Sequence, residues 1–170
     1  MGKGTLIARL LEEVPGLELA VSATTRRPRP GEVEGHDYYF LSPEDFDRRV
    51  QRGEFIEHAA YAGNRYGTLR SELDRPARGL VLEIDTQGAR QVRLALPEAT
   101  QAFIAPPSPE ALRERLVGRG SDDPEQIEER LRLAVRELEA QEEFEHVVVN
   151  DDLHRAVQEL AKVAATMSSP

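Results

Sequence analysis

Short apolar segments alternate along this chain with amphipathic segments of helical spacing, and this alternation restricts the fold more than any other feature. Apolar runs that end in polar residues or proline are typical of strands buried in a parallel sheet. Amphipathic segments between such runs are typical of the helices that connect parallel strands. The sequence therefore predicts an α/β protein, with parallel strands at 17–22, 80–84, 102–105 and 147–149.

Several helices are expected from local signals. A capping side chain, then proline, then an acid marks a helix start, and this pattern begins at Ser42, Ser108 and Asp123. The helix after Asp123 is expected to run to about Glu142. Further helices are expected at 3–13, 86–96 and 152–165, and aromatic residues with several glycines predict an inserted β-rich unit at 25–79.

Composition excludes several classes of protein. No run of 18 apolar residues is present, so no membrane span is expected, and the first residues resemble neither a signal nor a transit peptide. The absence of cysteine excludes disulfides and thiolate metal sites and favours a reducing, cytoplasmic location. A formal charge of −9, from 22 Lys+Arg and 31 Asp+Glu, disfavours binding to nucleic acid.

Two segments have the chemistry of phosphate binding. Gly2-Lys3-Gly4-Thr5 opens a helix and matches the second half of a P-loop, in which backbone N–H groups and an ammonium bind phosphate. So short a match can also be incidental. Gly4 stands where a magnesium-binding hydroxyl is usual, which leaves Thr5 as the nearest hydroxyl. Three arginines lie within four residues at 26–29, between an expected strand and Gly31. They are interpreted either as an anion site or as part of a solvated basic loop.

Ordered blocks along nearly the whole chain resemble guanylate kinase. The first is S-x-T-T-R-x-x-R-x-G-E, which begins at Ser22. The others follow in the family's order: Gly35–Phe40, Gly53–Glu57, Tyr66–Thr68, Ile84–Ala89, Ile104–Ser108, Arg115–Gly120 and Val149–Leu153.

The resemblance implies an enzyme that transfers the γ-phosphoryl group of ATP to GMP with the help of Mg²⁺. It implies a three-layer P-loop kinase with a doubly wound parallel sheet, whose core would be 1–24 and 80–170. Residues 25–79 would be a small mixed-β GMP-binding insert and 119–125 a helical lid. The substrates GMP and ATP would be its partners, without nucleic acid or membrane, and the protein would be a monomer or a homodimer.

The resemblance also assigns roles to residues on the GMP side. Glu57 and Thr68 match positions that read guanine, where a carboxylate can accept from N1–H and the 2-amino group, a donor pair that adenine lacks. Glu83 matches an acid near GMP. The positions that hold the GMP phosphate are matched by Ser22, Arg26, Arg29, Tyr38 and Tyr66.

On the ATP side, the resemblance assigns binding to Gly2, Lys3, Gly4, Thr5, Arg115 and Asn150. The catalytic set would be Lys3, Arg29, Arg115, Arg119 and Arg130, because phosphoryl transfer needs positioning and charge neutralisation. Mg²⁺ would be held through water by Thr5 and Asp85. Two simpler interpretations stay open: a role of Asp85 as no more than the cap of the next helix, and pairing of Arg130 with its flanking acids on a helix surface.

The family begins with a strand and a complete P-loop, whereas this chain enters that loop just before Gly2. The missing strand would lie between 80–84 and 102–105, so we expect the chain to fold poorly on its own. We favour a start codon assigned too late over a deliberate truncation or a naturally shortened relative. The alternative function is a catalytically impaired module that binds GMP or a phosphopeptide; RNA binding through the arginine loop is disfavoured by the net charge.

Overall fold

The computed structural model describes residues 3–108, 110–111, 113, 131–132, 135 and 138–166. They belong to two compact units, one made of residues 16–99 and the other of 1–15 with 100–170. The first unit is wider than the expected insert 25–79, because the strands and the helix that flank this insert pack with it. The expected lid 119–125 and most of the helix expected after Asp123 lie outside the described residues.

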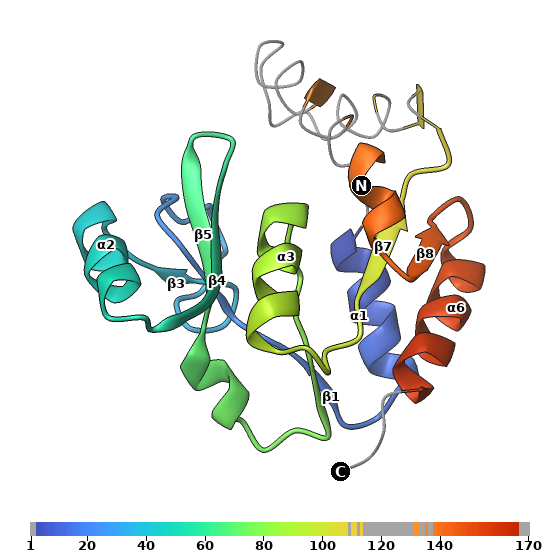
Figure 1. Ribbon diagram of the computed structural model, residues 1–170, viewed down its shortest axis with the longest axis horizontal. Coiled ribbons are helices and arrows are strands. Elements are labelled where there is room, and N and C mark those ends of the chain that lie inside the picture. Colours follow the sequence, from blue (N-terminus) through green and yellow to red (C-terminus); the bar gives the residue numbers. More distant parts are fainter. Residues whose placement is uncertain are drawn as a thin grey trace. The chain divides into compact units, whose positions relative to one another are not determined.

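A mixed four-stranded sheet is the centre of unit 16–99 (Figure 1). Its strands are β2 (Ser22–Thr24), β3 (Tyr39–Phe40), β4 (Phe55–Tyr61) and β5 (Asn64–Leu69), in the order β3-β2-β5-β4. β2 runs parallel to β3 and antiparallel to β5, which forms a hairpin with β4. Ala62 and Gly63 close the hairpin with φ of 47° and 76°, the left-handed conformation that tight hairpin turns require.

Helix α2 (Pro43–Gln51) packs against this sheet and begins as the sequence predicts. The Ser42 hydroxyl accepts a hydrogen bond from the backbone N–H of Asp45 at 3.1 Å, so Ser42 is the N-cap. Phe46 is fully buried and stacks on Phe55, with ring centroids 4.5 Å apart. Together with Ala23 and Leu69 these rings form the core between helix and sheet.

The expected strand 17–22 is two strands in two different sheets, which corrects the sequence interpretation. β1 (Leu17–Leu19) pairs in parallel with β6 (Gly79–Val81), whereas β2 belongs to the mixed sheet. The chain leaves the first sheet at Ala20, whose N–H donates to Val81 O at 2.9 Å. The expected strand 80–84 is likewise shorter, because regular pairing ends at Val81. The 3-10 helix η1 (Arg70–Asp74) precedes β6, and helix α3 (Thr86–Ala95) follows it.

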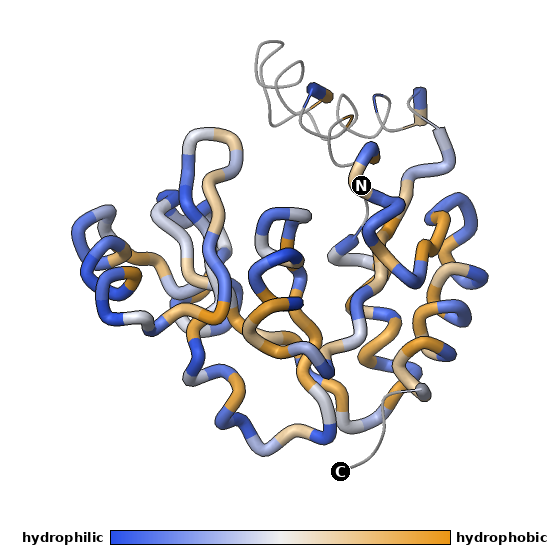
Figure 2. Tube along the Cα trace, in the orientation of Figure 1, coloured by the Kyte–Doolittle hydropathy of each residue, from blue (hydrophilic) through white to orange (hydrophobic). Residues whose placement is uncertain are grey.

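The other unit contains elements that the sequence places well. β7 (Ala102–Ala105) and β8 (His146–Val149) form a parallel pair, and α1 (Lys3–Glu13) packs against α6 (Leu153–Ala165). The 3-10 helix η2 (Ala140–Glu143) precedes β8. Figure 2 shows hydrophobic residues recurring between hydrophilic ones along α1 and α6. The residues buried in these two helices are Leu6, Ile7, Leu10, Ala156, Val157 and Leu160.

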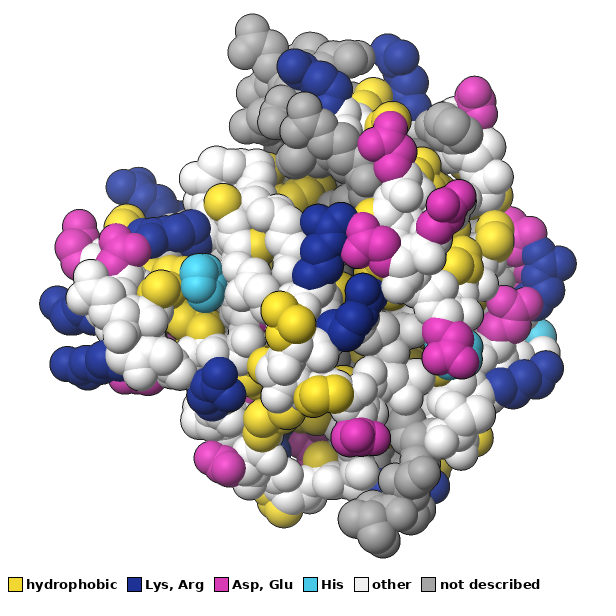
Figure 3. Space-filling model, viewed as in Figure 1, with side chains coloured by type: hydrophobic (Ala, Val, Ile, Leu, Met, Phe, Trp, Pro, Cys, Tyr) yellow, Lys and Arg dark blue, Asp and Glu magenta, His cyan; other side chains and the backbone are white. Residues whose placement is uncertain are grey.

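Outside the mixed sheet, the described strands form two separate pairs, β1 with β6 and β7 with β8. Both pairs are parallel, as the alternation of apolar and amphipathic segments predicts. The class of the fold is therefore α/β. Figure 3 shows that acidic and basic side chains are interspersed on the visible face, whereas binding to nucleic acid favours an extended basic surface.

Candidate active site

Three neighbouring strands of the mixed sheet place polar side chains side by side. Thr68 of β5 lies opposite Ser22 of β2 on one side and opposite Glu57 of β4 on the other. A bulge interrupts the β4–β5 pairing between Phe55 and Glu57. Bulges re-aim side chains, and here three consecutive residues, Phe55, Ile56 and Glu57, are all buried. The sheet therefore holds a carboxylate and two hydroxyls in one line across its strands.

The Glu57 carboxylate is buried, with only 4% of the residue exposed. Its Oε1 accepts a hydrogen bond from the Thr68 hydroxyl at 2.7 Å. Burial raises the pKa of Glu57 above its ordinary value, the hydrogen bonds from Thr68 lower it, and the nearby charge of Asp85 raises it. A carboxylate has room for about four donors, so this one can accept further N–H groups.

Helix α3 reaches Glu57 at a glycine that sequence reasoning did not single out. A Cβ on Gly88 would lie 2.5 Å from Glu57 Oε2, closer than real Cβ atoms approach, and 3.1 Å from its Cδ, which is a tight contact. The helix is attached to strand β4 by Gln91, which donates to His58 O at 2.7 Å and accepts from His58 N at 3.1 Å. The position of Gly88 within the block Ile84–Ala89, in the first turn of the expected helix, was the signal that the sequence offered.

An arginine and two tyrosines gather near the same strands. The Arg26 guanidinium lies over the Tyr38 ring, 5.2 Å from its centroid, and Tyr38 meets Tyr66 edge to face at 6.2 Å. Burial raises the pKa of Tyr38, and the negative charge of Glu83 raises it further. Exposed Glu83 therefore acts on the same cluster. The structure brings together three of the residues predicted for the GMP side: Arg26, Tyr38 and Tyr66.

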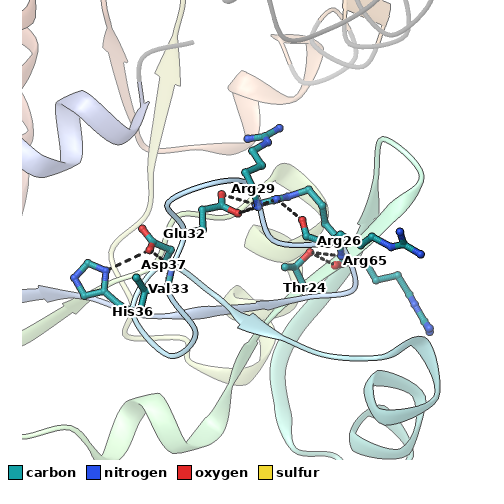
Figure 4. A network of polar contacts seen from close by, with 9 residues as sticks. Thr24, Arg26, Arg29, Glu32, Val33, His36, Asp37 and Arg65 are labelled. Atoms are coloured by element: carbon teal, nitrogen blue, oxygen red, sulfur yellow. Dashed lines mark hydrogen bonds and ion pairs between the residues drawn. The ribbon is translucent and has the colours of Figure 1, made fainter.

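The arginine loop contains an ion pair that sequence reasoning missed. Glu32 accepts from both terminal nitrogens of Arg26, at 2.8 and 3.0 Å, and also from the backbone N–H of Arg29 at 2.7 Å. Hydrogen bonding to Arg26 lowers the pKa of Glu32. The guanidinium of Arg29 points away from this carboxylate (Figure 4). Glu32 therefore holds one end of an otherwise exposed loop, in which Arg27 and Arg29 are exposed to solvent.

Asp85 caps the next helix, which is one of the two roles expected for it. It is the N-cap of α3, and its Oδ1 accepts from the backbone N–H of Gly88 at 2.8 Å. Its other oxygen accepts from Gln87 Nε2 at 3.1 Å. Among the residues that the structure describes, no group of three or more His, Asp or Glu side chains has the arrangement of a metal site.

The residues predicted for ATP belong to the other compact unit. Lys3, Gly4 and Thr5 form the first turn of α1, where backbone N–H groups lack helical partners. Asn150 directly follows β8, is buried, and its N–H donates to Ala105 O at 2.8 Å. Gly2, Arg115, Arg119 and Arg130 lie outside the described residues. In the described part of the chain, no helix is long and apolar enough to cross a bilayer.

Comparison with known proteins decides the family. The profile of the family described as guanylate kinase matches residues 1–167. The chain belongs to the guanylate kinase family. A guanylate kinase of Synechococcus sp. (strain CC9311) is 54% identical over 165 residues, which are 95% of this chain and 87% of that protein. A guanylate kinase of Thiobacillus denitrificans is 46% identical over 170 residues, 98% of this chain and 81% of that protein.

A solved structure agrees with the sequence relatives. The crystal structure of guanylate kinase from Anaplasma phagocytophilum is similar with a TM-score of 0.78 and 35% sequence identity, over 98% of this chain and 83% of that one. The resemblance inferred from the ordered blocks is therefore confirmed, and it extends to the three-dimensional structure.

Proposed function

We propose that this protein is a nucleoside monophosphate kinase that transfers the γ-phosphoryl group of ATP to GMP, giving ADP and GDP. The observation that carries the proposal is the buried Glu57 carboxylate, hydrogen-bonded to Thr68 on the strand whose next neighbour bears Ser22. The relatives named guanylate kinase support the same reaction. The comparisons give no support to a catalytically impaired binding module.

Guanine would be read by Glu57 and Thr68. The two oxygens of Glu57 would accept from N1–H and the 2-amino group of guanine, and Thr68 would keep the carboxylate oriented. Adenine offers no such donor pair on that edge, so AMP would leave a buried carboxylate without its partners. An unpaired buried polar group costs enough to give strong discrimination.

The phosphate of GMP would be bound by the cluster at the arginine loop. Arg26, which Glu32 holds through both terminal nitrogens, would supply positive charge, and the rigid hydroxyls of Tyr38 and Tyr66 suit phosphate oxygens. Arg29, whose guanidinium extends away from Glu32, would add a second positive charge (Figure 4). Ser22 would donate a hydroxyl from β2, and Glu83 would lie near the nucleotide.

ATP would be bound at the start of α1 by Gly2, Lys3, Gly4 and Thr5, with Arg115 and Asn150. A helix start supplies N–H donors and a favourable dipole for phosphate. Arg115, Arg119 and Arg130, with a lid at 119–125, would neutralise the migrating phosphoryl group together with Lys3 and Arg29. Mg²⁺ would neutralise charge on the triphosphate when bound, with Thr5 and Asp85 contributing through water. We propose the remaining expectations on the same basis: a doubly wound P-loop core at 1–24 and 80–170, a GMP-binding insert at 25–79, a cytoplasmic location, and a monomer or homodimer.

The test is a coupled assay of ADP formation with Mg·ATP and either GMP or AMP. Turnover with GMP but not with AMP supports the proposal, and no turnover with GMP contradicts it. Glu57→Gln should lower kcat/KM for GMP by at least about 10²-fold, because one oxygen becomes a donor that faces the guanine N–H groups. The KM for ATP should stay unchanged, and the exposed acid variant Glu98→Gln should behave like the wild type. Equal losses for GMP and ATP would contradict the guanine-reading role.

A further inference from the structure

A second buried carboxylate lies outside the residues predicted for nucleotide binding. Glu72, in η1, is only 3% exposed. Its Oε2 accepts from the backbone N–H of Val21 at 2.7 Å and from Arg75 Nη1 at 3.1 Å. Its Oε1 accepts from the Tyr39 hydroxyl at 3.0 Å. A buried acid with three directed donors is a rigid junction, because each lost bond would leave a polar group unpaired.

Two partners of Glu72 are chain neighbours of proposed phosphate ligands. Val21 immediately precedes Ser22 on entry to β2, and Tyr39 immediately follows Tyr38 at the start of β3. Side chains alternate between the two faces of an extended chain. Tyr38 accordingly meets Arg26 and Tyr66, whereas the Tyr39 ring packs against the core of the mixed sheet.

The junction is anchored to the neighbouring sheet as well. Arg75, which pairs with Glu72, also donates to Leu19 O at 2.9 Å and forms an ion pair with Glu18, both on β1. The Val21 contact therefore lies at the step where the chain passes from the β1–β6 pair to the mixed sheet. Burial raises the pKa of Tyr39, and its hydrogen bond to Glu72 raises it further, so this hydroxyl stays a proton donor.

We propose that Glu72 is a positioning residue that fixes the spacing of Ser22 and Tyr38 and so preorganises the site for the GMP phosphate. The inference rests on the proposed function, which assigns the phosphate to these two residues. Glu72 itself does not contact the nucleotide. Loosening the junction should weaken recognition of the phosphate while recognition of guanine by Glu57, on β4, is retained.

Two variants test the proposal without disturbing packing. Tyr39→Phe removes only the hydroxyl that donates to Glu72 and keeps the ring in the core. Glu72→Gln keeps the shape and replaces one accepting oxygen by a donor. Each should raise the KM for GMP about five- to tenfold, the order expected for one misplaced phosphate contact. The KM for ATP should remain within about twofold, which is smaller than the effect of one lost hydrogen bond.

Guanosine, which lacks the phosphate, gives the readout that a merely structural role would not produce. Its inhibition constant against GMP should be unchanged in both variants, because only the phosphate contacts are affected. Phe46→Leu, a core variant of the same sheet, is the matched control for general destabilisation, and it should leave the ratio of GMP to guanosine affinity unchanged.

The outcomes separate this inference from the proposed function. A wild-type protein that does not phosphorylate GMP contradicts the proposed function itself. A wild type that turns over GMP, with variants whose KM for GMP is unaltered, overturns the role of Glu72. Equal weakening of GMP and guanosine also overturns it, because that result shows a general loss of structure. Should Glu72→Gln fail to fold, Tyr39→Phe gives the same comparison.

Discussion

Replacing Thr68 by valine should destabilise the protein in a manner that depends on pH. Thr68 is 1% exposed, and its hydroxyl donates to Glu57 Oε1 at 2.7 Å. Valine has a similar shape but no donor, so the ionised carboxylate would stay buried with fewer partners. A buried charged acceptor that loses a donor costs about 1–3 kcal/mol. The predicted loss at neutral and alkaline pH is of this size.

The pH dependence follows from the direction of the pKa shift. Burial already raises the pKa of Glu57, so its contribution to stability is greatest in acid and is lost as pH rises through the folded-state pKa. The hydrogen bond from Thr68 opposes that loss by lowering the pKa. Its removal therefore raises the pKa further. The variant should be strongly destabilised where Glu57 is ionised and much less where it is protonated.

Urea denaturation followed by circular dichroism measures this difference. With a slope of about 2 kcal/mol per M, a loss of about 1–3 kcal/mol moves the midpoint by roughly 0.5–1.5 M. This shift should be present at about pH 8 and reduced at about pH 5, since protonation removes the buried charge.

Thr24→Val is the matched control for the Thr68 variant. Thr24 is fully buried in the adjacent strand, but its hydroxyl donates to Arg65 O at 3.0 Å and accepts from Arg26 N at 3.1 Å. Both partners are backbone groups that do not titrate, so its loss of stability should be equal at the two pH values. A loss at Thr68 that is also independent of pH would refute the reasoning.

Three further variants test other parts of the site and fold. Gly88→Ala places a Cβ 2.5 Å from Glu57 Oε2, so steady-state kinetics should show a raised KM for GMP with an unchanged KM for ATP; unchanged GMP kinetics would contradict the contact. Phe46→Ala should lower the free energy of unfolding by about 3–5 kcal/mol in urea titrations, because a fully buried ring leaves a cavity. Glu32→Gln should destabilise the protein near neutral pH but not in acid below the folded-state pKa, since its pairing with Arg26 lowers the pKa of Glu32; thermal melts across pH that keep a constant difference would contradict this.

Local signals predicted the elements whose causes lie within a few residues. Ser42 is an N-cap that the sequence indicates, and the helix at 3–13 and the strand at 102–105 have the predicted bounds. A capping side chain and an apolar period act over one or two turns, so they can be read directly from the chain. The ordered blocks likewise indicate the family, because their residues and their order are visible in the amino-acid sequence.

Features that depend on distant partners carry no local signal. The segment 17–22 is one apolar run, yet it divides between two sheets, and at the step between them the Val21 N–H donates to Glu72, 51 positions away. The hydrogen bonds between Gln91 and His58, 33 positions apart in the chain, likewise have no counterpart in the local pattern.

The amino-acid sequence was sufficient to predict the α/β class, most helix starts and the family of this protein. In contrast, the contacts that hold the residues proposed to bind guanine and phosphate depend on the folded arrangement. Glu57, Thr68 and Gly88 come from two strands and a helix, and the pKa of the buried carboxylate depends on which donors the fold brings to it. That balance of burial against hydrogen bonding is a property of the packed molecule.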